Sequence, residues 1–129
     1  MDVSVDSLIA NSVTRVFKAV FPNTTNHYDT LFGGTALQLM DEVSFICATR
    51  FSRKKVVTIS TGNIAFEKPI PQGTIIELVA EVIEVGNTSC TVQVTIYKED
   101  MYSYKREIAV TGKFKFVAID NAKKPIPII

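Results

Sequence analysis

Two neighbouring acids stand in the middle of an otherwise apolar stretch of the chain. Asp41 and Glu42 lie between Met40 and Val43. Burying an ionised carboxylate without partners costs several kcal/mol, so this pattern requires an explanation. One interpretation places both acids on a solvent-facing stripe with Gln38. The other places one acid in a cleft, held away from water, where it acts as a general base.

A pair of glycines, Gly33 and Gly34, precedes the same stretch. A tight turn that needs a positive φ would account for them. Two glycines at a helix N-terminus also leave backbone N–H groups exposed near the positive end of the helix dipole. Such groups suit a developing oxyanion or a phosphate.

Polar side chains directly before the glycines supply further candidates, Asn26 and His27. His27 is the only histidine, and no second group in the sequence is placed to orient it as a general base. Loop structure and substrate contact are the alternative roles for His27. Residue counts do not exclude a Ser-His-Asp triad, but no Gly-x-Ser-x-Gly elbow occurs. Walker and Gly-x-Gly-x-x-Gly phosphate-binding motifs are also missing from the sequence.

The acids belong to a predicted helix over Ala36–Phe51, with Thr35 as the N-cap or in the first turn. Apolar residues occur on nearly all sides of this helix, which is typical of a buried helix. The main apolar face is expected to hold Ala36, Leu37, Met40, Val43 and Cys47.

The remaining segments predict strands. One covers Asn11–Phe21 and is followed by a loop at Pro22–Thr30, whose length suggests a functional role. Four further strands are expected over Val56–Phe66, Thr74–Val85, Ser89–Lys98 and Tyr104–Ile119, and an irregular tail over Asn121–Ile129. This order predicts an α+β domain in which a five-stranded antiparallel sheet wraps around one long central helix. The first strand and the last ones should leave an edge and a face that need a partner.

Composition sets the broad class. The 129 residues are expected to form a single domain over 1–129, with its core at about 12–120. A net charge of +1 argues against non-specific binding to nucleic acid or membrane. Cys47 and Cys90 are expected to be buried reduced thiols. Met1–Asp6 has no basic n-region, so no signal peptide is expected, and a cytoplasmic location follows by default.

Two strings resemble a known family: Pro22–Gly34, which ends in Leu-Phe-Gly-Gly, and Leu39–Glu42. They are similar to the signature of the cytosolic acyl-CoA thioester hydrolases, which are hotdog-fold proteins. Weaker matches follow in the right order over nearly the whole chain, at Val56–Thr58, Phe66–Ile70, Gly73, Gly86–Ser89 and Phe116–Asp120.

The resemblance implies hydrolysis of acyl-CoA to a fatty acid and CoA. Asp41 would act as base or nucleophile, together with Asn26 from the opposite subunit of a homodimer. Amides at Gly33 and Gly34 would polarise the thioester carbonyl. No metal and no cofactor are implied beyond the CoA of the substrate, and family members often form hexamers as trimers of dimers.

The same resemblance implies a set of CoA-binding residues. They are Thr58, Phe66, Lys68, Asn87, Thr88 and Ser89.

Three positions depart from the family pattern. Thr24 stands where an acid is usual, Gly62 where an aspartate is common, and Asp29 where glycine is usual. A glycine at position 29 allows backbone shapes that aspartate adopts less readily, and the extra charge lies near the site. The alternatives are therefore a non-catalytic acyl-CoA-binding hotdog protein, a hotdog hydratase that would need an Asp-His pair, and a structural interaction domain. Acyl-chain length stays open.

Overall fold

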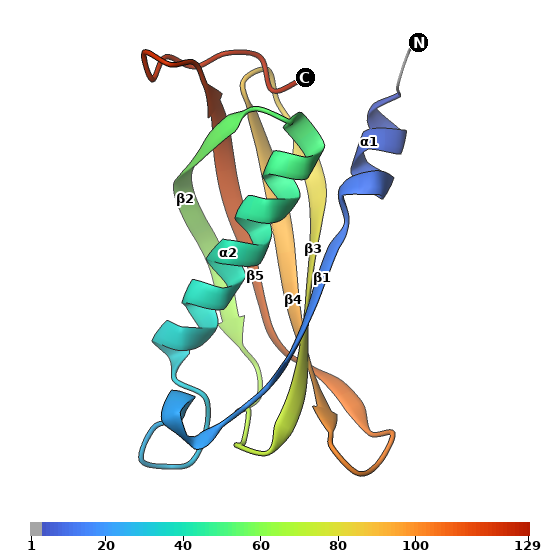
Figure 1. Ribbon diagram of the computed structural model, residues 1–129, viewed down its shortest axis with the longest axis vertical. Helices are drawn as coiled ribbons and strands as arrows, with labels where there is room; N and C mark the ends of the chain where they lie inside the picture. Colours follow the sequence, from blue (N-terminus) through green and yellow to red (C-terminus); the bar gives the residue numbers. More distant parts are fainter. Residues whose placement is uncertain (1–3) are drawn as a thin grey trace.

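The computed structural model describes residues 4–129, so the first residues of the Met1–Asp6 segment lie outside the described part. Figure 1 shows one long helix lying across one face of a curled sheet. In chain order the elements are helix α1 (Val5–Ser12), strand β1 (Thr14–Ala19), a 3-10 turn η1 (Pro22–Thr24), helix α2 (Gly33–Ser52), and strands β2 (Lys55–Phe66), β3 (Thr74–Val85), β4 (Ser89–Asp100) and β5 (Arg106–Ile119).

The five strands form one antiparallel sheet in the order β1-β3-β4-β5-β2. The predicted α+β architecture, a sheet wrapped around a central helix, is confirmed. The prediction that the last strands leave an edge is wrong. Strand β2 pairs with β5, with Val57 opposite Val117, so β5 is internal and the two edges are β1 and β2.

Strand alternation builds the core, because every second residue points to the face that α2 covers. Leu78, Val94 and Phe114 are fully buried there. At Gly112 an added Cβ would lie 2.9 Å from Met40 Cε and 2.3 Å from Ile64 Cδ1. The absence of a side chain at Gly112 therefore lets α2 approach the sheet closely.

The N-terminal segment differs from its prediction as a strand over Asn11–Phe21. Helix α1 ends at Ser12, and β1 covers only Thr14–Ala19. The Ser4 hydroxyl caps α1 by accepting a hydrogen bond from Ser7 N at 3.1 Å. Arg50 of α2 donates to the carbonyl of Asn11, at the end of α1, at 2.9 Å. A helix of eight residues has too few turns to produce a clear apolar period.

Helix α2 begins three residues before the predicted Ala36, and Thr35 lies in its first turn rather than at the N-cap. The expected burial on all sides is wrong for a single chain, because the sheet covers only one face. Leu37 is 37% exposed although it was placed on the main apolar face. Ala48, which is not among the residues predicted for that face, is fully buried.

The C-terminal tail is irregular, as predicted, but it is held in place. Ile126 N and Ile128 N donate to the carbonyls of Ala118 and Asn87, each at 2.9 Å. The side chain of Ile128 is fully buried. None of the helices within residues 4–129 has the length and apolar character needed to cross a membrane.

Candidate active site

Asp41 lies on the side of α2 that faces the edge strand β2. Its Oδ1 accepts a hydrogen bond from the Thr58 hydroxyl at 3.1 Å. The Asp41 side chain is exposed, as are those of Glu42 and Gln38. In a single chain, the acids therefore face solvent, as the first interpretation expects. Shielding of Asp41 from water stays a prediction that concerns an assembly of several chains.

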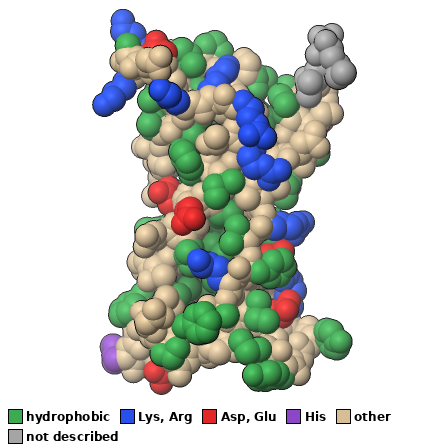
Figure 2. Space-filling model, viewed as in Figure 1, with side chains coloured by type: hydrophobic (Ala, Val, Ile, Leu, Met, Phe, Trp, Pro, Cys, Tyr) green, Lys and Arg blue, Asp and Glu red, His purple; other side chains and the backbone are tan. Residues whose placement is uncertain are grey.

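Exposed apolar side chains surround this carboxylate. Leu37 and Phe45 lie one turn before and one turn after Asp41, on the same side of α2. They are 37% and 46% exposed, and Val57 and Ile59 on β2 are 41% and 52% exposed. Figure 2 shows acidic side chains flanked by hydrophobic ones in the middle of this face. An exposed apolar surface of this kind marks a contact region between chains or a ligand-binding groove.

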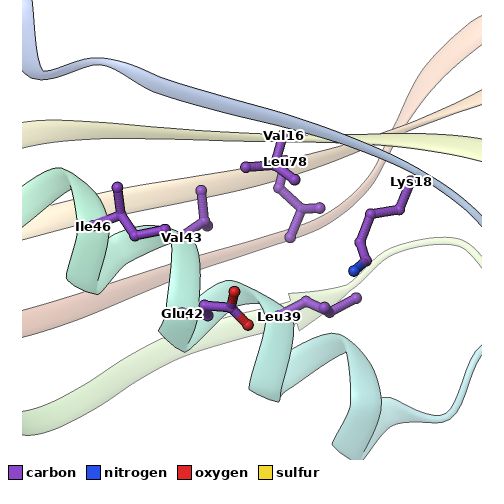
Figure 3. Close-up of a pocket in the computed structure, with 7 residues that line it drawn as sticks. All are labelled: Val16, Lys18, Leu39, Glu42, Val43, Ile46 and Leu78. Atoms are coloured by element: carbon purple, nitrogen blue, oxygen red, sulfur yellow. The ribbon is translucent and has the colours of Figure 1, made fainter.

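Glu42 lies on another side of the helix, at a small hollow between α2 and β1 (Figure 3). The hollow has a volume of about 30 Å³, roughly the space that one water molecule occupies in the liquid. It is lined by Val16, Lys18, Leu39, Glu42, Val43, Ile46 and Leu78. A space of this size does not accept an acyl chain, so the hollow at Glu42 is not a substrate pocket.

The Asn26 side chain organises the loop before α2. Its Oδ1 accepts hydrogen bonds from Tyr28 N at 2.9 Å, Thr30 N at 3.2 Å and Thr30 Oγ1 at 3.0 Å. The side-chain NH₂ group is then the part of Asn26 that remains for a substrate or water. Thr30 was missed from the sequence, although an asparagine followed by a hydroxyl residue in a turn-rich segment is a usable signal for such a network.

His27 is exposed next to this network, and its ring centroid lies 3.9 Å from that of Tyr28. Within residues 4–129 no carboxylate is hydrogen-bonded to the His27 ring. Without an acid to orient the imidazole, the geometry favours a loop or contact role over general-base catalysis.

Gly33 and Gly34 are the first two residues of α2. Neither has a positive φ, so the tight-turn interpretation is wrong; among the described glycines only Gly73 has one, at 77°. Phe32 at the N-cap provides no side-chain hydrogen bond. The amides of Gly33 and Gly34 have no acceptor within residues 4–129. They are therefore available, at the positive end of a long helix, to an oxygen that gains negative charge.

A hollow of about 280 Å³ lies beside this helix start. It brings together three predicted residues, Gly33, Phe66 and Lys68, with the apolar side chains of Leu31, Ala36, Ile70 and Val110. The Lys68 ammonium already pairs with Glu107 at 3.1 Å. Hydrogen bonds from Lys68, and then from Lys98, lower the pKa of Glu107 below its ordinary value.

The turn with Asn87, Thr88 and Ser89 lies at the other end of the molecule, beside the C-terminus of α2. Helix α2 has 20 residues and so spans about 30 Å. One chain therefore does not bring this turn together with Gly33. The carbonyls of Asn87 and Thr88 also hold the tail and β5, through Ile128 N and Ala118 N at 2.9 Å.

Asp29 adopts the left-handed conformation that a glycine would adopt, with φ at 59°. Its N–H donates to Asn26 O at 3.0 Å and its carbonyl accepts from Gln72 N at 2.8 Å. Asp29 is therefore accommodated in this loop, with both of its backbone polar groups hydrogen-bonded. Thr24 has a local role, since its hydroxyl donates to Phe21 O at 2.8 Å. Gly62 lies at a register irregularity of β2.

Both cysteines are buried, as predicted. Burial raises the pKa of Cys47 and of Cys90 to about 11 each. Neither thiol is ionised near neutral pH, so neither is a nucleophile for this site.

A five-stranded antiparallel sheet wrapped around one long helix defines the hotdog class of proteins. The sequence model of the thioesterase superfamily matches residues 28–105. The chain belongs to this superfamily.

Related proteins agree with this assignment. The chain is 39% identical over 109 residues to a Bacillus subtilis protein named as an uncharacterized acyl-CoA thioester hydrolase, which covers 84% of this chain. The chain spans only 63% of the length of that relative.

Two solved structures are similar to this one. An acyl-CoA hydrolase from Staphylococcus aureus, in complex with butyryl-CoA and CoA, has a TM-score of 0.89 at 37% identity, with 92% of this chain and 73% of that chain covered. The hexameric thioesterase of Yersinia pestis has a TM-score of 0.80 at 28% identity, with 87% and 91% covered. The S. aureus enzyme has also been solved as three single variants, in which alanine replaces an asparagine, an aspartate or a threonine.

Proposed function

We propose that this chain hydrolyses acyl-CoA thioesters to a fatty acid and CoA, in composite sites built from two copies of the chain. The arrangement of α2 carries the proposal. Asp41 lies eight residues after Gly33 on one helix, so it is about 12 Å further along the helix axis. A carboxylate and an amide at that separation do not serve the same carbonyl carbon. A second copy has to bring its Asn26 and its open amides to Asp41.

Residue spacing supports the choice of catalytic residues. In the S. aureus enzyme the replaced asparagine and aspartate are 15 residues apart, and the aspartate and threonine are 17 apart. Asn26, Asp41 and Thr58 have the same two separations in this chain. Thr58 therefore acts here as a positioning residue, because its hydroxyl bonds to the Asp41 carboxylate and fixes the orientation of that group.

The partner surface is the exposed side of α2 with the neighbouring edge strand. The apolar side chains of Leu37, Phe45, Val57 and Ile59 are exposed there, and β2 has unpaired backbone groups on its outer edge. Pairing β2 with a second β2 would continue the sheet and shield Asp41 from bulk water. We propose a homodimer of this kind, and a trimer of such dimers as the complete hexamer.

In the reaction, Asp41 removes a proton from a water molecule whose oxygen attacks the thioester carbonyl carbon. The NH₂ group of the partner's Asn26 holds the water or the carbonyl. The carbonyl oxygen becomes an oxyanion beside the amides of the partner's Gly33 and the partner's Gly34. The C–S bond then breaks, and the CoA sulfur leaves with the proton from Asp41. Direct attack by Asp41, which gives an anhydride that water hydrolyses, stays open as the second route.

The CoA contacts are assigned by position. Phe66 and Lys68 line the hollow at the start of α2 and would contact the arm of CoA next to the thioester. Asn87, Thr88 and Ser89 of the other copy would contact the nucleotide end of the same CoA. A two-fold axis places the C-terminal end of one α2 near the N-terminal end of the other.

A cytoplasmic location stays a prediction.

Thiol release tests the proposal. Purified protein is mixed with acyl-CoAs of increasing chain length, and free CoA is followed with a thiol reagent. We expect turnover with at least one chain length. Saturable acyl-CoA binding without CoA release would instead identify the non-catalytic binder, and no binding at all would leave only a structural domain.

A further inference from the structure

A further hollow lies on the exposed side of α2, towards the C-terminal end of the helix. It lies between α2 and the start of β2, and its volume is about 450 Å³. The lining residues are Phe45, Thr49, Arg53, Lys54, Lys55 and Val56. The Thr49 hydroxyl is buried and has no hydrogen-bond partner within residues 4–129. We name this hollow the Phe45 notch.

The proposed composite site fixes which part of the second copy faces the Phe45 notch, and the inference rests on that site. Suppose that the two α2 helices run antiparallel, with the partner's Gly33 opposite Asp41. The two-fold axis then crosses α2 at Leu37, which is midway between positions 33 and 41 of the helix. Phe45 and Thr49 then lie about 12 and 18 Å from the axis, measured along α2. The partner's Gly33 is only about 6 Å from the axis on that side. The notch therefore faces the loop that precedes the partner's helix.

That loop carries a side chain of suitable chemistry at its tip. The bonds of Asn26 to Asp29 and Thr30 close a tight turn, and Thr25 pairs with Leu31 across its base. Tyr28 lies within this turn and is 74% exposed. Figure 1 shows the loop beyond the N-terminus of α2, at the opposite end of the helix from the notch. A two-fold axis is the operation that brings the two together.

We infer that the partner's Tyr28 inserts into the Phe45 notch. The ring packs against the exposed Phe45 side chain and lies beside the cations of Arg53 and Lys54, which the face of an aromatic ring attracts. Tyrosine suits a pocket with an apolar wall, formed by Phe45 and Val56, and a cationic rim, formed by Arg53, Lys54 and Lys55. Tyr28 is two residues from Asn26, and its backbone N–H bonds to the Asn26 side chain. The insertion thus couples dimer formation to the position of the partner's Asn26 at Asp41.

Chemical cross-linking tests this contact. The Tyr28→Cys, Phe45→Cys double variant is treated with a short bis-maleimide, and products are separated by denaturing electrophoresis. We expect a covalent dimer. The native thiols do not compete, because Cys47 and Cys90 are buried. The matched control carries Tyr104→Cys in place of Tyr28→Cys and should give monomer, because Tyr104 is a fully exposed tyrosine on the β4–β5 hairpin.

The dissociation constant of the dimer gives a second readout. Tyr28→Ala should raise it roughly tenfold or more, whereas Tyr104→Ala should leave it unchanged. A dimer that releases CoA but neither cross-links nor weakens with Tyr28→Ala overturns the inference and leaves the proposed function intact. A cross-linked dimer with no thioesterase activity supports the contact and rejects the proposed function.

Discussion

Both sides of helix α2 carry apolar side chains, but their surroundings differ. On the inner side Met40, Val43 and Cys47 are buried against the sheet. On the outer side Leu37 and Phe45 are exposed on either side of Asp41. The inner side therefore stabilises the fold of one chain, whereas we propose that a second chain completes the outer side. In this proposal one helix divides stability and catalysis between its two sides.

The largest effect is expected at the centre of the outer side. Asp41→Asn removes the proton acceptor while preserving the shape of the side chain and its bond from Thr58. We expect kcat to fall by ~10²–10⁴-fold with little change in the free energy of unfolding. Steady-state CoA release and chemical denaturation measure the two quantities. Glu42→Gln is the matched control and should keep nearly full activity; equal losses in both variants would contradict the choice of Asp41.

The inner side should give the reverse result. Met40→Ala removes a fully buried side chain and leaves a cavity over Gly112. We expect the free energy of unfolding to fall by about 2–5 kcal/mol, while kcat per folded molecule changes little. Denaturant titration together with an active-site count separates the two effects. Gln38→Ala, on an exposed part of the same helix, should change the free energy of unfolding by less than about 0.5 kcal/mol.

A smaller effect is expected where the outer side meets β2. Thr58→Val keeps the shape of the residue and removes the hydroxyl that donates to Asp41. A hydrogen bond to a charged group contributes about 1.5–3 kcal/mol, so we expect kcat to fall roughly 10–100-fold. Because Thr58 positions Asp41, Thr58→Ser should restore most of the rate. A failed rescue would show that the methyl group, not the hydroxyl, is the part of Thr58 that matters.

The smallest effect is expected in the loop. Asp29→Gly places the more permissive residue at a left-handed backbone position that Asp29 already adopts. We expect the free energy of unfolding to change by less than about 1 kcal/mol, and the rate to stay the same or rise slightly. Activity assays of both proteins at several salt concentrations measure this. A rise of several orders of magnitude would show that Asp29 suppresses catalysis.

Much of the architecture could be predicted from local patterns. Two patterns predict an α+β fold with a sheet wrapped around α2: the alternation in β3 and β4, and the long apolar helix. Strands that are buried on one face have apolar residues at every second position. The order of the strands could not be predicted, since the pairing of β2 with β5 depends on how the whole sheet curls. The short helix α1 was also missed, because eight residues provide only two turns.

The candidate site could be predicted in part. Asp41 and Gly33 stood out because a charge in an apolar helix and glycines at its start are locally unusual. The Thr58 contact with Asp41 joins α2 to β2 across 17 residues, and no local pattern reveals it. The separation of Asn87 from Gly33 likewise depends on the direction of each element in space.

Hybrid dimers test the shared site most directly. Asp41→Asn protein is mixed with Asn26→Asp protein, which keeps the loop-forming oxygen and removes the NH₂ group. Differently tagged chains show by co-purification that subunits have exchanged. Half of the dimers formed from an equal mixture are hybrids with one intact site of two, so we expect about a quarter of the wild-type activity from two inactive parents. Exchange with no recovery of activity would contradict a site that two chains share.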